Sequence, residues 1–238
     1  MPKDPMTDFP SIADHLMIWM FGIILPFFSG LQSDQLNGAI QFDAYSRKKL
    51  YLGNSIMLSL AGSSILILWY WKSRTWSSLG FQWPVPDNYK ILWAAGILLT
   101  VMYAIDLVYS SQAIENEEEA WFDKSSFLPQ SIRELPYYIL LCFCAGFFEE
   151  IIYRGFMVSY FGEGAKDGIP WLTLLAPALL FSLAHFYQGW AAVLKITILA
   201  ILLNVIFLYS KSLYPTMILH FLIDLVSGLA GMKRKQSQ

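Results

Sequence analysis

Charged residues are scarce in this 238-residue chain. Asp, Glu, Lys and Arg make up 14% of it, whereas a soluble globular domain carries roughly 25%. Apolar residues make up 56%, above the roughly 45–50% of a soluble domain. The deficit of charge excludes an ordinary soluble domain and predicts a chain that lies mostly in a lipid bilayer.

A basic excess is missing as well. The formal net charge is -2, and no cluster of Lys and Arg is long enough to hold a polyanion. Nucleic acid is therefore excluded as a partner, and the lipid bilayer is the expected surrounding.

Cysteine is nearly absent. Cys142 and Cys144 are the only two, and they lie two residues apart in one apolar run. On a helix this spacing points them in different directions, so they cannot bridge each other easily. We interpret them as small core residues rather than as a redox pair.

Long apolar runs are what the sequence has in place of charge. A helix that crosses the hydrocarbon core needs about 20 mostly apolar residues. Seven runs approach that length, at residues 12–29, 50–71, 91–109, 135–161, 171–186, 191–209 and 213–231. The sequence therefore predicts an all-α fold, a polytopic transmembrane bundle of about seven helices, with six to eight as the range. The first run is short, and a further half-span at 36–45 is the reason for the upper limit.

Composition divides the chain into three parts. Residues 1–130 hold the N-terminal helices and an acidic loop, residues 131–232 a membrane unit, and residues 233–238 a basic tail. The acidic run within 110–134 is interpreted as a solvated loop or an interfacial helix. No internal repeat of the kind found in many transporters is visible.

Orientation follows from the bias of Lys and Arg towards cytoplasmic loops. The basic residues 233–235 predict a cytoplasmic C-terminus, and with seven spans the basic residues 47–49 fall on the same side. Lys72, Arg74 and Lys90 then fall on the opposite side, so the bias is small.

Ionisable residues interrupt the fourth run. Glu149, Glu150 and Arg154 lie in an otherwise apolar stretch, and a charge at membrane depth costs about 2.5 to 3.5 kcal/mol even on the lenient insertion scale. Glu150 and Arg154 are four apart, so they share a helix face and are predicted to pair. Glu149 lies about 100° around the helix and is left free for other work.

Histidines interrupt two further runs. Phe181 and His185 share a face near the end of the fifth run, and His220 and Asp224 share a face of the seventh. With a rise of about 1.5 Å per residue, Glu149 and His185 lie at the same level to within a turn. His220 lies roughly 10 Å into its span, so the three groups could converge in a cavity displaced from the midplane. The sequence therefore predicts a polar intramembrane cavity formed by the last four helices.

Each of these features also has a purely structural interpretation. A lone histidine can join helices by a hydrogen bond, and Glu150 with Arg154 can be a buried structural pair. Asn204, mid-span in the sixth run, is interpreted as a helix-packing residue that could also line the cavity, while Asp106 and Lys195 are expected to reach the interface. The combination on three helices favours a functional site.

The motifs on these helices resemble those of a family of intramembrane proteases. Glu-Glu-x-x-x-Arg at 149–154, Phe-x-x-x-His at 181–185 and His-x-x-x-Asp at 220–224 occur in the family's order. The family includes the type II CAAX prenyl endopeptidases and bacterial bacteriocin-processing or self-immunity proteins, known as CPBP or Abi proteins. The resemblance covers roughly 135–231. It implies an endopeptidase in the cell membrane that cleaves a membrane-associated or lipidated peptide.

The resemblance also implies catalytic roles. Glu149, assisted by His185, would act as general base on the attacking water, and His220 with Asp224 would lie near the oxyanion. An ionised Asp224 cannot donate to an oxyanion, so its role is left open: it is protonated, orients His220 or binds something cationic. Three further side chains are implied as supporting residues, Glu150, Arg154 and Phe181.

A metal is a second open point. Relatives have been described as metalloproteases, and Glu149, His185 and His220 would be the ligands if a divalent ion such as zinc is bound. Against a metal, the chain has no His-Glu-x-x-His stretch, and the ligands must come from three helices.

Two other classes of function compete with the peptidase. One is a non-catalytic membrane protein, such as a self-immunity or assembly factor, that uses the polar cluster for binding. The other is an ion-coupled or proton-coupled transporter. The presence of both motif glutamates and both histidines argues against the first, and the lack of repeats argues against the second. The natural substrate, its prenylation and the oligomeric state are left open.

Overall fold

The computed structural model describes residues 9–28, 44–84, 127–164, 170–188 and 190–236, together with residue 96. These residues form helices and no strand, which confirms the all-α prediction. Within them, four helices are long and apolar enough to cross a membrane, Ala44–Trp71, Leu135–Gly162, Ala192–Ser210 and Leu213–Ala230, and two shorter apolar helices are Ile12–Phe28 and Trp171–Leu183.

Six of the seven predicted spans coincide with helices. The elements outside the fourth span are α1 (Ile12–Trp19), the π-helical turn η1 (Met20–Ile24), α3 (Ala44–Trp71), α7 (Pro170–Leu183), α8 (Trp190–Ser210) and α9 (Leu213–Gln236). Two short 3-10 turns are η2 (Trp76–Leu79) and η6 (Phe186–Gln188). The predicted span 91–109 with Asp106, the half-span at 36–45, Lys90 and the acidic run lie outside the described residues.

The fourth span changes its helical geometry where the motif begins. It starts as α5 (Leu135–Cys144), continues through the π-helical segments η4 (Ala145–Glu149) and η5 (Ile151–Met157), and ends as α6 (Val158–Gly164). In a π-helical turn the backbone bonds i to i+5, and such turns are frequent at functional sites. The sequence predicts an ordinary α-helix here, so the wider turns around Glu149 and Glu150 are an addition from the structure.

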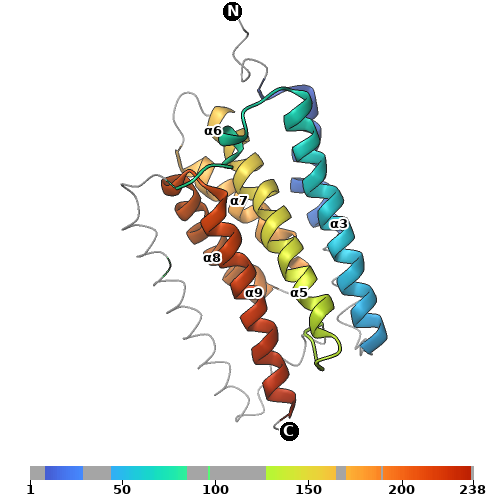
Figure 1. Ribbon diagram of the computed structural model, residues 1–238. Helices are drawn as coiled ribbons and strands as arrows, with labels where there is room; N and C mark the ends of the chain where they lie inside the picture. Colours follow the sequence, from blue (N-terminus) through green and yellow to red (C-terminus); the bar gives the residue numbers. More distant parts are fainter. Residues whose placement is uncertain are drawn as a thin grey trace, which may run out of the picture.

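The fourth span is the centre of the bundle. It packs against α3 and α9 along its length and against α7 and α8 at the motif, and Figure 1 shows α3, α5 and α9 side by side. Gly146 permits the close approach to α9, because a Cβ at this position would lie 2.9 Å from the backbone nitrogen of Phe221 and 3.0 Å from the carbonyl oxygen of Met217. Cys142 and Cys144 are both buried in this span and are not bridged, as expected for core residues.

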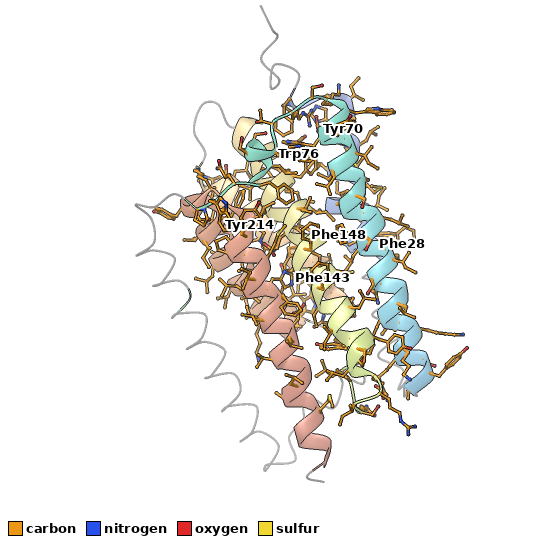
Figure 2. The ribbon with its side chains drawn as sticks, viewed as in Figure 1. Phe28, Tyr70, Trp76, Phe143, Phe148 and Tyr214 are labelled. Carbon is orange, nitrogen blue, oxygen red and sulfur yellow. The ribbon has the colours of Figure 1, made fainter. Side chains whose placement is uncertain are left out.

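Large apolar side chains cover the outside of the bundle. Phe28, Tyr70 and Phe143 are all more than half exposed (Figure 2). Some charged side chains, in contrast, are buried between the helices: Asp14, Arg47, Arg74, Glu134, Glu150 and Arg154. This distribution is the one expected for a protein whose outer surface meets lipid.

Ion pairs fasten both ends of α3. At its start, Arg47 Nε lies 2.6 Å from Glu134 Oε2. Beyond its end, Arg74 donates through two nitrogens to the carboxylate of Asp14, at 2.8 and 2.6 Å. The start of α3 and the C-terminal end of α9 lie at the same end of the bundle (Figure 1), as the predicted topology requires. The assignment of that end to the cytoplasm stays a prediction.

Candidate functional site

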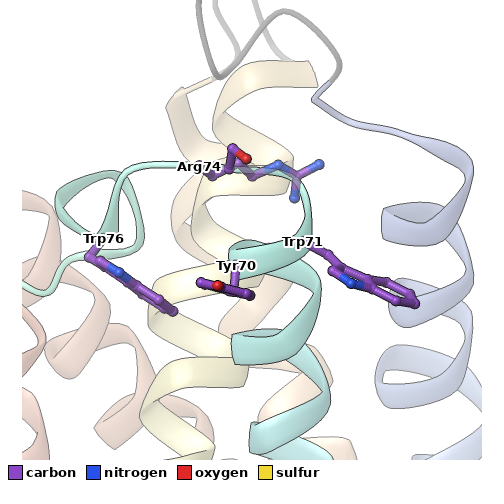
Figure 3. Close-up of a pocket in the computed structure, with 5 residues that line it drawn as sticks. Tyr70, Trp71, Arg74 and Trp76 are labelled. Atoms are coloured by element: carbon purple, nitrogen blue, oxygen red, sulfur yellow. The ribbon is translucent and has the colours of Figure 1, made fainter.

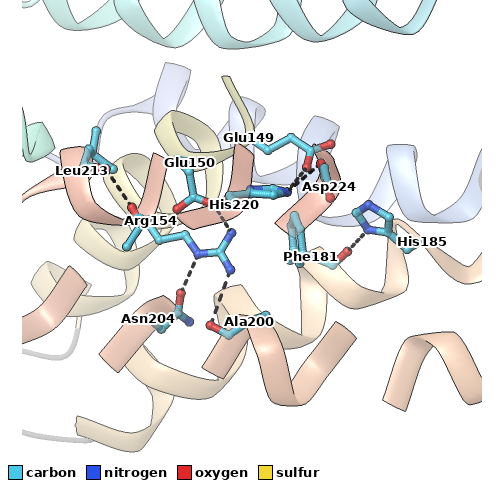
Figure 4. A network of polar contacts seen from close by, with 11 residues as sticks. Glu149, Glu150, Arg154, Phe181, His185, Ala200, Asn204, Leu213, His220 and Asp224 are labelled. Atoms are coloured by element: carbon cyan, nitrogen blue, oxygen red, sulfur yellow. Dashed lines mark hydrogen bonds and ion pairs between the residues drawn. The ribbon is translucent and has the colours of Figure 1, made fainter. Parts of the chain in front are cut away.

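The side chains singled out in the sequence gather into one polar cluster (Figure 4). Glu150 Oε1 accepts two hydrogen bonds, from Arg154 Nη1 at 2.8 Å and from His220 Nδ1 at 2.7 Å. Glu150 and Arg154 are fully buried. The pair predicted from the four-residue spacing is therefore present, and the same carboxylate oxygen also joins the fourth span to α9.

His220 stands between three carboxylates. Its Nδ1 faces Glu150, while its Nε2 lies 3.7 Å from Glu149 Oε2 and 3.6 Å from Asp224 Oδ2. The side chains of His220, Glu149 and Asp224 are 6%, 13% and 35% exposed. The cluster is therefore most accessible at Asp224 and closed at Glu150.

His185 lies in the turn that follows α7. Its Nδ1 is 2.8 Å from the carbonyl oxygen of Phe181, and a carbonyl can only accept, so Nδ1 carries a proton. In the neutral imidazole the lone pair is then on Nε2. The ring stacks on Tyr187 at a centroid distance of 6.2 Å. Among the described residues, His220 forms an ion pair with Glu149 and His185 does not.

Phe181 is the apolar centre of the cluster. The guanidinium of Arg154 lies 4.6 Å from its ring centroid. Its ring lies 4.7 Å from that of His185, 5.8 Å from that of His220 and 4.9 Å from that of Tyr153. A guanidinium over an aromatic face is a favourable contact when desolvated. The aromatic residue predicted to floor a pocket beneath one imidazole thus contacts both imidazoles.

Asn204 completes the surroundings of Arg154. Its Oδ1 accepts from Arg154 Nε at 3.1 Å, and its Nδ2 donates to the carbonyl oxygen of Leu174 in α7 at 2.7 Å. Asn204 is fully buried. Asn204 therefore joins two helices, as expected from the sequence, and also lies beside the motif.

Two tyrosines of the cluster were not singled out in the sequence. Tyr153 lies inside the Glu-Glu-x-x-x-Arg motif, and Tyr187 follows His185 by two residues. Their only signal was this proximity to the motifs, and aromatic residues are common throughout the chain. Tyr187 comes near the histidine because the chain turns sharply through η6.

The residues expected to hold a metal do not form a metal site as they are arranged. No group of three or more His, Cys, Asp or Glu side chains in the described residues is placed to hold an ion. The Nδ1 atoms of His185 and His220 are engaged by Phe181 and Glu150. An engaged Nδ1 leaves Nε2 as the ring atom that would face an ion, as in many metal-binding histidines. Metal binding therefore stays a prediction, and no step below passes through a metal.

A separate pocket lies beyond the end of α3 (Figure 3). It is lined by Tyr70, Trp71, Ser73, Arg74 and Trp76, none of which belongs to the polar cluster. Arg74 is already bound to Asp14 there. The five lining residues include no carboxylate and no imidazole that could act as a general base.

Comparison with known proteins points to the same segment. Residues 131–226, which contain the whole polar cluster, match the family model of the type II CAAX prenyl endopeptidase Rce1-like proteins. The chain is also similar to the uncharacterized protein YpbD of Bacillus subtilis (strain 168), with 25% identity over 146 residues that cover 60% of this chain and 70% of that protein. No solved structure gives a significant match.

Proposed function

Since residues 131–226 belong to the type II CAAX prenyl endopeptidase Rce1-like family, we propose that this multi-pass membrane protein is an endopeptidase in which Glu149 activates the hydrolytic water. The family supports a CAAX-type intramembrane protease in general. The observation that carries the finer proposal is the division of labour between adjacent carboxylates. Within the described residues, Glu150 is tied to Arg154 and His220, whereas Glu149 has only a long contact with His220.

Glu149 is the general base in this proposal. It takes a proton from the water whose oxygen attacks the carbonyl carbon of the scissile peptide bond. The 3.7 Å between Glu149 Oε2 and His220 Nε2 is longer than a hydrogen bond of about 2.7 to 3.2 Å. His220 therefore attracts the Glu149 carboxylate by charge without a hydrogen bond to it. The lone pairs of Glu149 stay available to the water.

His220 supplies the positive charge that the oxyanion needs. Its Nδ1 is held by Glu150, so its Nε2 has a fixed direction, and a pre-oriented donor stabilises negative charge without reorganising during the reaction. When the C–N bond breaks, the proton taken by Glu149 passes to the leaving amine nitrogen. In this proposal His185, with its lone pair on Nε2, is the second proton acceptor that assists Glu149.

The ion pair of Arg154 and Glu150 fixes the position of His220 relative to Glu149. The pair is inaccessible to water, and its oppositely charged groups offset part of the cost of burying each other. Phe181 beneath the guanidinium and Asn204 beside it also hold Arg154 in this position. The pair therefore positions His220 and does not itself touch the substrate.

The proposal is tested with purified protein in lipid nanodiscs. The wild type and Glu149→Gln are compared on a library of membrane-anchored peptides, prenylated and unprenylated, each with and without a chelator. Lys72→Gln, a change at an exposed residue outside the cluster, is the matched control. We expect cleavage by the wild type and the control, and a loss of about 100-fold or more for Glu149→Gln, since general base catalysis contributes about that much.

Each arm of the experiment decides one point. Cleavage that survives the chelator supports a water activated by glutamate, and cleavage abolished by the chelator and restored by zinc supports a metal-bound water. If the wild type cuts no peptide and cells that carry Glu149→Gln behave like cells that carry the wild type, hydrolysis is refuted. Binding by the polar cluster, as in a self-immunity or assembly factor, then becomes the better account.

A further inference from the structure

The charges of the polar cluster do not balance. It contains three carboxylates, from Glu149, Glu150 and Asp224, and one permanent cation, Arg154. Arg154 is paired with Glu150. Among the described residues, His220 is the cation that remains to compensate Glu149 and Asp224, and its single Nε2 faces both of them at 3.6 to 3.7 Å. One imidazolium can neutralise only one of two carboxylates.

No lysine or arginine of the described residues forms an ion pair with Glu149 or Asp224. The other ionisable groups near these two carboxylates are His185, His220 and the Glu150–Arg154 pair, and His185 is neutral in the mechanism proposed above. The catalytic state proposed above requires an ionised Glu149. In that state the cluster keeps one uncompensated negative charge in a site that is mostly closed to water, where charge is costly.

Asp224 is where a substrate can meet that charge. Its side chain is 35% exposed, against 13% for Glu149 and none for Glu150. It lies one helical turn after His220 on the same face of α9, so it sits beside the imidazole that faces the oxyanion. An ionised aspartate cannot donate a hydrogen bond to the substrate carbonyl, but it can accept one from a cation.

We propose that the site takes peptides with a cationic group, a lysine or arginine side chain or a free amine, next to the scissile bond, and that Asp224 is the residue that selects this group. The inference rests on the proposed function and adds its substrate class. A bound cation compensates the charge left over at Asp224 and leaves His220 to Glu149 and the oxyanion. A peptide with a carboxylate at the same position meets repulsion and is disfavoured.

The test uses three matched membrane-anchored peptides that differ only at the residue next to the scissile bond, which is lysine, norleucine or glutamate. Binding is measured with non-hydrolysable versions, and kcat/KM with cleavable ones, in nanodiscs of uncharged phosphatidylcholine. The proteins are the wild type, Asp224→Asn, Asp224→Ser and Lys72→Gln. The melting temperature of each variant is recorded so that misfolding is detected.

We expect the wild type to bind the lysine peptide about 10-fold more tightly than the norleucine peptide, the size of a partly desolvated charge pair, and the glutamate peptide most weakly. Folded Asp224→Asn or Asp224→Ser should bind the first two peptides alike. Lys72→Gln makes the whole chain one charge more negative without touching the cluster, so it strengthens the preference only if net charge is the cause.

Two results overturn the inference: equal binding of the three peptides by the wild type, or an unchanged preference in both folded Asp224 variants. The experiment distinguishes failure of this inference from failure of the proposed hydrolysis. If the wild type cuts all three peptides equally, the endopeptidase stands and the selectivity falls. If the binding preference is found but no peptide is cut, the selectivity stands and hydrolysis falls.

Discussion

Glu150 and His220 are 70 residues apart in the sequence and share a hydrogen bond of 2.7 Å between Oε1 and Nδ1. The same oxygen accepts from Arg154. One buried carboxylate oxygen therefore connects the motif of the fourth span with the histidine of α9. The position of His220 relative to Glu149 depends on this bond.

Glu150→Gln should destabilise the protein because it leaves Arg154 as a buried charge without its carboxylate. Breaking one partner of a buried ion pair costs about 3 to 5 kcal/mol. We expect a loss of about 3 kcal/mol, measured by unfolding in detergent. Leu60→Ala on α3 is the control, since Leu60 is 68% exposed on the outer surface. Equal stabilities of the two variants would contradict a structural role for Glu150.

Asn204→Leu should change His220 at a distance. The variant removes the acceptor for Arg154 Nε and the donor for the Leu174 carbonyl, and each unpaired buried group costs about 1 to 3 kcal/mol. The released guanidinium alters Glu150 and hence the hydrogen bond to His220. The chain has only three histidines, so their ring ¹⁵N resonances can be resolved.

In Asn204→Leu we expect the His220 resonances to shift and those of His15 to stay. His15 is the internal reference because its Nδ1 is hydrogen-bonded to Tyr160 at 2.6 Å, outside the cluster. A folded variant in which His220 keeps its wild-type resonances would show that Asn204 packs helices and does nothing more.

Gly146→Ala should separate the fourth span from α9. The new Cβ would lie 2.9 to 3.0 Å from backbone atoms of Phe221 and Met217, which cannot give way as a flexible side chain can. Overpacking of this kind costs about 1 to 3 kcal/mol. Gly53→Ala in α3 is the matched control, because a Cβ there meets nothing within 4 Å, and alanine favours a helix by up to about 1 kcal/mol. If both variants unfold alike, the close approach at Gly146 has no energetic weight.

Low pH should weaken the ion pair between Arg47 of α3 and Glu134 at the start of the fourth span. Burial raises the pKa of Glu134, but hydrogen bonds from Arg47, Ser131 and the Gln130 backbone outweigh it, so this pKa lies below its ordinary value of 4.5. A carboxyl with a lower pKa in the folded state stabilises the fold fully above its unfolded pKa. The contribution is lost as the pH falls through the folded value.

The measurement is the melting temperature of the wild type and of Glu134→Gln between about pH 6 and about pH 3. The variant should melt at a lower temperature at the upper pH, and the difference should shrink below about pH 4.5. Lys49→Gln is the control for a change of surface charge, because Lys49 is exposed and lies over the ring of Tyr45 in the same helix. A difference that is constant over the whole range would exclude Glu134 as the titrating group.

The parts of this structure that depend on local spacing could be predicted from the sequence. Apolar length located the spans, and the four-residue interval paired Glu150 with Arg154. The rise per residue placed Glu149 and His185 at the same level and let His220 converge with them, and the side chains of Glu149 and His220 do come within 3.7 Å. Each of these properties follows from the geometry of one helix.

The parts that depend on how helices rotate against each other could not be predicted. The pairs of Arg47 with Glu134 and of Arg74 with Asp14 join residues 87 and 60 positions apart. Lipid and protein interior are both apolar, so a membrane helix has little hydrophobic periodicity to show which face turns inward. The π-helical turns of the fourth span likewise depend on packing against neighbouring helices and have no signature in the local sequence.

The two ion pairs of α3 have a consequence for how the protein sits in bilayers of different thickness. This helix has 28 residues, and its apolar run, residues 50–71, is about 33 Å long, close to a hydrocarbon core of about 30 Å. Because both of its ends are fastened to other helices, α3 cannot adapt to a thinner bilayer by sliding alone. A thinner bilayer tilts the fastened helices together, and the depth at which Glu149 meets a substrate changes with the tilt.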